Sequence, residues 1–395
     1  MPIAGASNAR ISPQRYQGKL VELEGLRGVA IVLVTLHHFW PDSGVLYATL
    51  APLAHLGWIA VDLFFVISGL LIGGILLDTR ASPDYFRNFY ARRILRIFPL
   101  YYAFVCALFI VVPIGQSMIH KVGYLQSEFI RESGNPLWYL LFAGNIRESI
   151  TGVEPAYFLA PLWSISIEEQ FYLMSPLLIR HLSPQTLKRV LIGLILFSPV
   201  FRLVMLELVP DNERIQYLAT LSRFDNLSVG VLLALMLRTD ALPDRRTTGI
   251  ALGTTGLALA VAFVTGGLDR NGWFCRVFGY SLLAGFFVVL VFWAIQNRGE
   301  RVTAALRARW LVYLGGLCYG LYLLQRPAEV LLLKALAFAG IALEQYPTLS
   351  LFGKIGFSVL VAHASWHLFE KPINALKDRF RSEHHPLDRA PGQRV

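Results

Sequence analysis

The chain alternates long apolar stretches with short polar segments, and this pattern continues almost to the C-terminal end. Ten stretches are candidates for membrane spans: residues 26–41, 56–77, 97–115, 161–180, 190–208, 217–237, 248–268, 277–296, 310–328 and 350–369. A helix needs about 20 apolar residues to cross the hydrocarbon core of a bilayer. We therefore predict an all-α, polytopic transmembrane helical bundle of about ten spans.

The positions of Lys and Arg predict how this bundle is oriented. Arg10, Arg15 and Lys19 precede the first span, whereas the loop from Pro41 to His55 contains neither Lys nor Arg. Cytoplasmic loops are enriched in these two residues, so both termini are predicted to be cytoplasmic. The predicted layout is a cytoplasmic segment 1–22, a transmembrane domain 23–372 and a cytoplasmic tail 373–395.

One apolar segment, residues 136–146, does not fit this scheme. It has only about 11 residues, too few to span a bilayer. If it did span, Arg180, Lys188 and Arg189 would lie outside the cell. We interpret it as a re-entrant or half-depth helix, which leaves those residues in the cytoplasm, and the spanning alternative stays open.

Composition favours a membrane protein over a soluble one. Apolar residues make up 55% of the chain and charged residues 16%, with a mean hydropathy of +0.52, whereas soluble domains carry about 25% charged residues. Basic cytoplasmic loops explain the net charge of +10, so we predict a multi-pass protein of the cell (cytoplasmic) membrane without a nucleic-acid partner. The three scattered cysteines predict no metal site. The polar N-terminus predicts no cleavable signal peptide.

The first span carries ionisable residues on one face. Arg27 and His38 are 11 positions apart, so they return to within roughly 20° of each other and lie about 16 Å apart along the helix axis. His37 is predicted to point about 100° away. Ionisable residues within a span often mark a functional site. An interfacial anchor and a packed imidazole would explain the pair about equally well.

The second span contains an acidic residue and a pair of small residues. Asp62 lies near its outer end, where it would cap the helix or hold a facing histidine in one tautomer. Ser68 and Gly69 lie in the middle of the span. Small residues let helix backbones approach each other, so we predict close helix packing there rather than catalysis by Ser68.

Two further pairs of charged residues are candidates for chemistry. Arg93 and Arg96 are i and i+3 on one helical face, which suits bidentate phosphate binding, although a basic anchor at the membrane surface has the same pattern. Glu168 and Glu169 stand within an apolar run, either for acid–base chemistry or to balance arginines. The candidate arginine partners are Arg27, Arg202 and Arg223. Arg223 and Asp225 are predicted to form a charge arrangement within the membrane, not a catalytic pair.

Together these segments resemble the acyltransferase 3 family of integral membrane O-acyltransferases. Its blocks are matched by LEGLRGVAIVLVTLHHF, VDLFFVISGLLI, RILRIFPLYY, PLWSISIEEQFYL, RFDNLSVG and YGLYLL. Each block is weak alone, but six in order make a specific match from Leu23 to about Pro372. The resemblance implies transfer of an acyl group, commonly acetyl, from coenzyme A to a hydroxyl of a sugar or lipid-linked glycan.

The family's motifs imply roles for individual residues. The Arg-x10-His pattern falls on Arg27 and His38, and the resemblance implies that His38 is a general base or an acyl relay. The Arg-x-x-Arg pattern on Arg93 and Arg96 implies contacts with the phosphates of acyl-CoA, which is a donor substrate and not a permanently bound cofactor. The Glu-Glu-Gln element falls on Glu168, Glu169 and Gln170. The predicted catalytic set is therefore His38, Arg27, Asp62, Glu168 and Glu169.

One departure and one alternative accompany this prediction. Family members often have a histidine before the proline that ends the tyrosine-rich span, but this chain has Gln325 and Arg326 there, so we assign no catalytic role to that position. The alternative is a proton-coupled secondary transporter, which buried ionisable residues and a broken segment would also suit. Against a transporter, the sequence contains no visible repeat of one half in the other.

Overall fold

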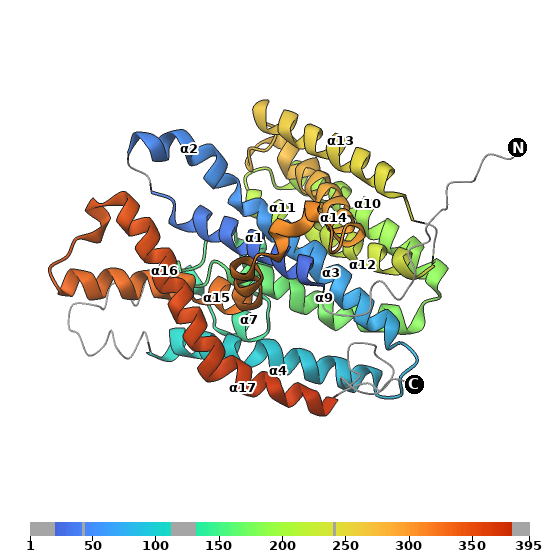
Figure 1. Cartoon of the computed structure of the whole chain (residues 1–395), viewed down its shortest axis with the longest axis horizontal. Helices are drawn as coiled ribbons and strands as arrows, with labels where there is room; N and C mark the ends of the chain where they lie inside the picture. The colour runs from blue at the N-terminus through green and yellow to red at the C-terminus, as the bar shows by residue number, and fades with distance from the viewer. Residues whose placement is uncertain (1–19, 42–43, 112–131, 240–241, 381–395) are drawn as a thin grey trace, which may run out of the picture.

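The computed structural model describes residues 20–41, 44–111, 132–239 and 242–380, and all regular elements among them are helical (Figure 1). Ten helices have 16 to 30 residues: α1 (Val21–Phe39), α3 (Ala60–Asp78), α4 (Tyr85–Cys106), α9 (Leu162–His181), α10 (Pro184–Leu208), α12 (Phe224–Thr239), α13 (Arg245–Val264), α14 (Tyr280–Gln296), α15 (Arg309–Phe338) and α16 (Pro347–Ser365). Each carries most of one of the ten apolar stretches, although residues 112–115 of the third stretch lie outside the described part of the chain. The all-α prediction is confirmed for the described residues.

Shorter helices connect these ten. Those of α type are α2 (Val45–His55), α7 (Leu137–Leu140), α8 (Gly144–Thr151), α11 (Glu213–Leu218) and α17 (Lys371–Ala375). Single turns of 3-10 or π geometry are η2 (Leu56–Ile59), η3 (Ala107–Val111), η4 (Thr220–Arg223), η5 (Cys275–Gly279), η6 (Arg301–Arg307), η7 (Leu343–Gln345), η8 (Trp366–Glu370) and η9 (Leu376–Phe380).

Two connections bear on the predicted topology. Residues 136–146 do not form one helix: α7 has 4 residues, α8 has 8, and Phe142 between them has a positive φ of 51°. This segment is therefore too short and too broken to span as a single helix, as predicted. The prediction of a loop from Pro41 to His55 is largely wrong, because residues Val45–His55 form α2, which continues through η2 into α3. The residues Arg10, Arg15 and Lys19 lie outside the described part of the chain.

Seven helical runs are long and apolar enough to cross a membrane: Tyr47–Asp78, Tyr85–Ile110, Pro184–Leu208, Thr220–Arg238, Arg245–Val264, Cys275–Gln296 and Pro347–Phe380. The other three long helices, α1, α9 and α15, each carry three or four charged residues. They are also the helices that bring most of the candidate chemistry. The count of ten spans and the orientation of the termini stay predictions.

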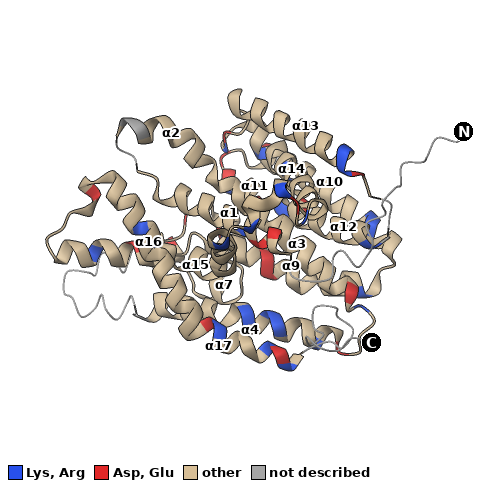
Figure 2. Ribbon diagram, viewed as in Figure 1, with Lys and Arg blue, Asp and Glu red and all other residues tan. Residues whose placement is uncertain are grey.

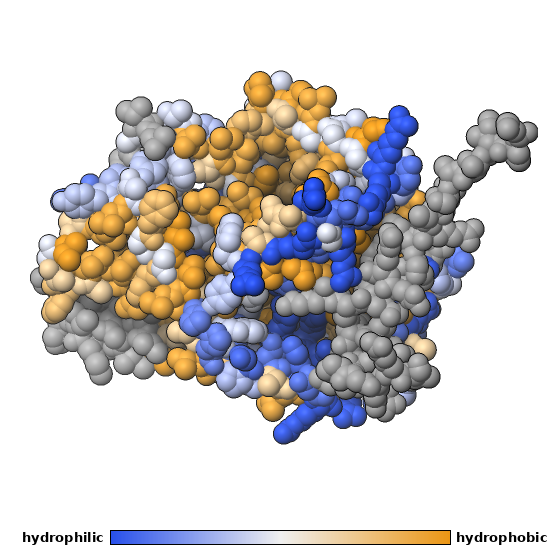
Figure 3. Space-filling view, viewed as in Figure 1, coloured by the Kyte–Doolittle hydropathy of each residue, from blue (hydrophilic) through white to orange (hydrophobic). Residues whose placement is uncertain are grey.

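The apolar outside of the bundle agrees with a multi-pass membrane protein. Only 11% of the apolar window of α13 is buried, and large side chains such as Phe338 (97% exposed) and Val264 (82% exposed) project outward. In Figure 3, hydrophobic residues cover much of the visible face, while hydrophilic residues gather toward the lower right. Figure 2 shows Lys and Arg residues along α4, which lies beside α17.

Glycines bring the inner helices into backbone contact. A Cβ atom added to Gly25 of α1 would lie 1.9 Å from the carbonyl oxygen of Leu306, and one added to Gly315 of α15 would lie 2.0 Å from that of Glu24. In the α3–α12 contact, a Cβ atom on Gly69 would lie 2.1 Å from the carbonyl oxygen of Leu227. The predicted close packing at Gly69 is therefore confirmed, and these contacts fix α1 and α3 against their neighbours.

Candidate active site

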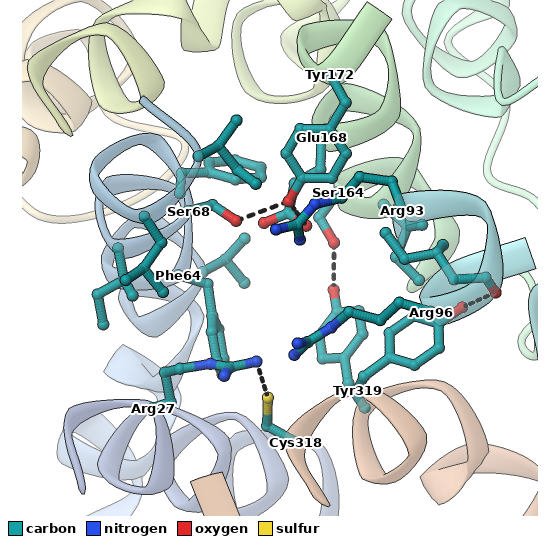
Figure 4. A pocket seen from close by; sticks show the side chains of 18 of the residues that line it. Arg27, Phe64, Ser68, Arg93, Arg96, Ser164, Glu168, Tyr172, Cys318 and Tyr319 are labelled. Atoms are coloured by element: carbon teal, nitrogen blue, oxygen red, sulfur yellow. Dashed lines mark hydrogen bonds between the residues drawn. The ribbon is translucent and has the colours of Figure 1, made fainter. Parts of the chain in front are cut away.

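The predicted arginines converge in one cavity, which we call the arginine pocket. It has a volume of about 230 Å³ and its walls come from α1, α3, α4, α9 and α15. Arg27 of α1 and Arg93 and Arg96 of α4 all point into it, and the carboxyl group of Glu168 of α9 lies near the Arg93 guanidinium (Figure 4). Residues that are far apart in the sequence thus form one strongly basic site.

The three arginines differ in how much of their hydrogen-bonding capacity is free. The Arg27 guanidinium pairs with Glu24 at 3.2 Å and donates to the Cys318 sulfur at 3.0 Å. The guanidinium carbon of Arg93 lies 5.5 Å from the centre of the Tyr172 ring. Arg96 forms no hydrogen bond or ion pair with any described residue. Arg93 and Arg96 therefore keep N–H groups for an anionic ligand, which suits phosphate.

Hydroxyl groups line the same cavity beside the carboxyl group of Glu168. Tyr172 donates to Glu168 at 3.1 Å and its hydroxyl lies 2.9 Å from that of Ser68. Ser164 and Tyr322 share a hydrogen bond of 2.8 Å. The sequence analysis missed Tyr172, Ser164 and Tyr322, although Tyr172 follows Glu168 by one helical turn and could have been found from that spacing.

A second cavity, which we call the histidine pocket, has a volume of about 180 Å³ and is lined by His37, His38, Trp58, Tyr217 and Arg326, among others. The prediction that His37 points away from the site is wrong. Both imidazoles line the pocket, and their ring centres are 5.6 Å apart. The cavity wraps around the last turn of α1, so a 100° difference in direction does not separate the two rings. Each ring has an Nδ1 atom that is buried without a hydrogen-bond partner among the described residues.

The two pockets lie at opposite ends of α1 and share a wall. Arg27 is in the second turn of the helix and His38 is in the last. Val61 of α3 and Tyr322 of α15 line both cavities. The predicted pair Arg27 and His38 therefore belongs to two adjoining cavities rather than to one.

A buried acidic residue and an ion pair border the histidine pocket. Glu148 of α8 lines it and pairs with Arg214 at 3.4 Å, and Arg214 also pairs with Glu154 at 3.0 Å. Burial raises the pKa of Glu148 to about 8, although the charge of Arg214 acts in the opposite direction. This carboxyl group is therefore largely protonated at neutral pH.

Asp62 does not take the position predicted for it. Its carboxylate is fully buried and accepts hydrogen bonds from Arg223, at 2.8 Å, and from Asn226. It does not cap α3, and none of its contacts with described residues is with His38. The reason is that Arg223 projects into the same space and a buried carboxylate needs a cation close by. Asp62 lies in the bundle as a structural charge.

A second buried ion pair extends this charge arrangement. Arg202 and Asp225 are both fully buried, 3.0 Å apart. Arg223 and Asp225 therefore belong to a buried charge arrangement within the bundle, as predicted, and its position inside the membrane stays a prediction. The prediction that Glu168 and Glu169 form ion pairs with buried arginines is wrong. The arginines at 27, 202 and 223 pair instead with Glu24, Asp225 and Asp62.

The Glu-Glu-Gln element points in three directions, because successive helical residues turn by about 100°. Glu168 lines the arginine pocket, whereas Glu169 lines neither of the two pockets and has a buried oxygen without a partner among the described residues. Gln170 donates to the Phe142 carbonyl at 2.7 Å and to Asn145 at 2.9 Å. Gln170 thus ties α9 to the broken segment α7–α8.

Comparison with known proteins identifies the family. The model of the acyltransferase 3 family, described as an acyltransferase domain, matches residues 20–366. The chain belongs to the acyltransferase 3 family. This match includes both pockets, from Arg27 of the arginine pocket to Arg326 of the histidine pocket.

Several curated acyltransferases are similar to the chain over most of its length. It is 26% identical over 377 residues to O-acetyltransferase OatA of Staphylococcus aureus, covering 89% of this chain and 56% of that protein. It is 28% identical over 370 residues to the putative peptidoglycan O-acetyltransferase YrhL of Bacillus subtilis, covering 89% and 54%. The chain spans about half the length of these relatives. No solved structure matches it.

Proposed function

We propose that the protein is a membrane O-acyltransferase that moves an acyl group from acyl-CoA to a hydroxyl group of a glycan. We propose acetyl as this group, because the relatives are named O-acetyltransferases. The donor binds in the arginine pocket and the acceptor binds in the histidine pocket. The observation that carries this proposal is the arrangement of these two cavities, which adjoin at Tyr322 and Val61.

The arginine pocket suits the donor because coenzyme A carries a 3′-phosphate and a pyrophosphate. Arg93 and Arg96 offer free guanidinium N–H groups on one side of the cavity, and bidentate contacts of arginine with phosphate are strong and directional. Arg27, held by Glu24 and Cys318, positions the donor from the opposite helix. The acyl end of the pantetheine arm then lies toward the shared wall.

The histidine pocket supplies a base for the acceptor. His38 takes the proton of the acceptor hydroxyl as the oxygen attacks the thioester carbonyl carbon. The C–O bond forms, the C–S bond breaks, and the protonated imidazole returns its proton to the CoA thiolate. Its unpartnered Nδ1 atom supports this role, because a base needs a free nitrogen. If His38 is instead an acyl relay, an imidazole nitrogen attacks the thioester carbon and displaces the CoA thiolate. The acceptor oxygen then attacks the acyl-imidazole and breaks its C–N bond, and the acceptor's proton passes to the thiolate.

The class of acceptor follows from the relatives. YrhL of Bacillus subtilis and OatA of Listeria monocytogenes are named as peptidoglycan O-acetyltransferases, the former putatively. A glycan hydroxyl is therefore the acceptor we propose for this chain. Membership in an acyltransferase family favours this function over a proton-coupled transporter, which would leave acyl-CoA unchanged.

The test is release of free CoA from acetyl-CoA by the purified protein in lipid vesicles, with and without peptidoglycan fragments. We expect release that requires the glycan and that falls by about 10²- to 10⁴-fold in His38→Ala, the usual range for loss of a general acid–base. His37→Ala is the matched control, since His37 lines the same pocket, and it should retain most of the activity. Release that is the same in both variants and in the wild type would rule out His38 as base or relay.

A further inference from the structure

The histidine pocket contains two arginines that lack a carboxylate partner. Of its three arginines, Arg214 pairs with Glu154 at 3.0 Å and also lies 3.4 Å from the carboxyl group of Glu148. Within the described ranges, no Asp or Glu forms an ion pair with Arg270 or Arg326. Glu213, the remaining carboxylate of the pocket, forms no ion pair with either of them, so Arg326 is left without a carboxylate partner among the described residues.

Arg326 is held in a fixed orientation by neighbouring side chains. Its guanidinium carbon lies 3.9 Å from the centre of the Tyr157 ring, which is the distance of close stacking. The Tyr157 hydroxyl donates to Glu329, and Glu329 pairs with Lys354 at 2.8 Å. Because stacking uses the face of the guanidinium, its N–H edge stays available. The Nε atom is buried and has no hydrogen-bond partner among the described residues.

The place of Arg326 matches that of a substrate-binding group. It lines the same cavity as His37 and His38. The other charged groups without partners, Arg270 and Glu213, are exposed to solvent, where water weakens their interactions. A ligand anion would meet its strongest attraction at the half-buried Arg326.

We propose that Arg326 is a specificity-determining residue that selects an acceptor glycan bearing an anionic group, a carboxylate or a phosphate, near the hydroxyl that His38 activates. This inference rests on the proposed function, because it treats the histidine pocket as the acceptor site. The anion is bound by the N–H edge of Arg326 and supplies the counter-charge that this guanidinium lacks. Arg270 attracts the same anion toward the opening of the pocket.

The experiment compares three small sugars as probes: methyl β-glucoside, methyl β-glucuronoside and glucose 6-phosphate. Their binding to the full chain in detergent is measured by calorimetry in a His38→Ala background, so that the result does not depend on turnover. Acetyl transfer to the same sugars is measured with protein that retains His38. The variants are Arg326→Gln, the charge-conserving Arg326→Lys, and the control Arg309→Gln, an exposed arginine at the N-terminal end of α15.

We expect at least one of the two anionic sugars to bind about 10- to 100-fold more tightly than the neutral sugar, the range for a charge-assisted hydrogen bond. Arg326→Gln should remove this preference without changing the affinity for methyl β-glucoside. Arg326→Lys should keep part of it, which shows that the pocket is still folded, and Arg309→Gln should change nothing. Whichever anionic sugar binds more tightly identifies carboxylate or phosphate as the group selected.

Two outcomes separate this inference from the proposed function. If the anionic preference depends on Arg326 but no acetyl group is transferred, the binding site stands and the proposed function fails. If acetyl is transferred equally to neutral and anionic sugars, and Arg326→Gln changes neither binding nor transfer, the inference is overturned while the acyltransferase remains. Equal binding of all three sugars with no transfer overturns both.

Discussion

Replacing Arg96 by glutamine should weaken donor binding while leaving the chemical step nearly intact. Arg96 forms no hydrogen bond or ion pair with the described residues, so its removal costs the fold little and its contact with phosphate is lost in full. A hydrogen bond to a charged group contributes about 1.5–3 kcal/mol, which corresponds to an increase of about 10- to 150-fold in KM for acetyl-CoA. We expect kcat at saturating donor to change by less than about threefold, because the arginine binds ground state and transition state alike.

The assay compares acetyl-CoA with its 3′-dephospho form for the wild type, Arg93→Gln and Arg96→Gln. A variant whose arginine contacts the 3′-phosphate should lose affinity only for the complete donor, whereas an arginine on the pyrophosphate should lose affinity for both donors equally. Arg309→Gln, an exposed arginine elsewhere, should leave both KM values unchanged. If Arg93→Gln and Arg96→Gln both keep KM within twofold of the wild type for both donors, the arginine pocket does not bind the donor phosphates.

Three further predictions concern the fold. Asp62→Ala leaves the buried Arg223 guanidinium unpaired and should lower the free energy of unfolding by about 3–5 kcal/mol, measured by chemical denaturation in detergent; a loss below about 1 kcal/mol would contradict a buried ion pair. Gly69→Ala should lower the thermal midpoint below that of the wild type, since its Cβ atom would lie 2.1 Å from the Leu227 carbonyl oxygen; an unchanged midpoint would contradict this contact. The raised pKa of Glu148, about 8 against an unfolded value near 4.3, contributes stability at low pH that is lost as the pH rises toward 8. Glu148→Gln should therefore show a smaller fall in thermal midpoint from pH 5 to 8, and an unchanged fall would refute that shift.

The sequence predicted the helices well because spanning segments must satisfy their backbone hydrogen bonds internally. This constraint makes apolar length a strong signal, and the described part of each of the ten stretches lies mostly on a long helix. The signal fails for α2, whose residues are apolar but continue into α3 instead of forming a loop. Apolar length also does not predict which helices lie inside the bundle. Some charged residues of α1, α9 and α15 line the two pockets, and only the packing of the helices shows this.

The candidate site could be predicted only in part. Helical spacing placed Arg93 and Arg96 on one face, and the family motif added Arg27, but neither could show that α1 and α4 meet at one cavity. Asp62 was misassigned because its partner Arg223 is 161 positions away. Spacing within a helix gives directions but not the shape of a cavity, which is why His37 was excluded and nevertheless lines the pocket.

We propose that α1 crosses the bilayer, so that the pockets at its two ends open to opposite sides. The most direct test of the account is therefore acetyl transfer between opposite sides of a sealed vesicle. Radiolabelled acetyl-CoA is enclosed inside vesicles that contain the protein, and peptidoglycan fragments are added outside or enclosed as well. The account predicts labelled glycan when donor and acceptor are on opposite sides, and none from His38→Ala vesicles. Labelled glycan that forms only when both substrates share one side would contradict it.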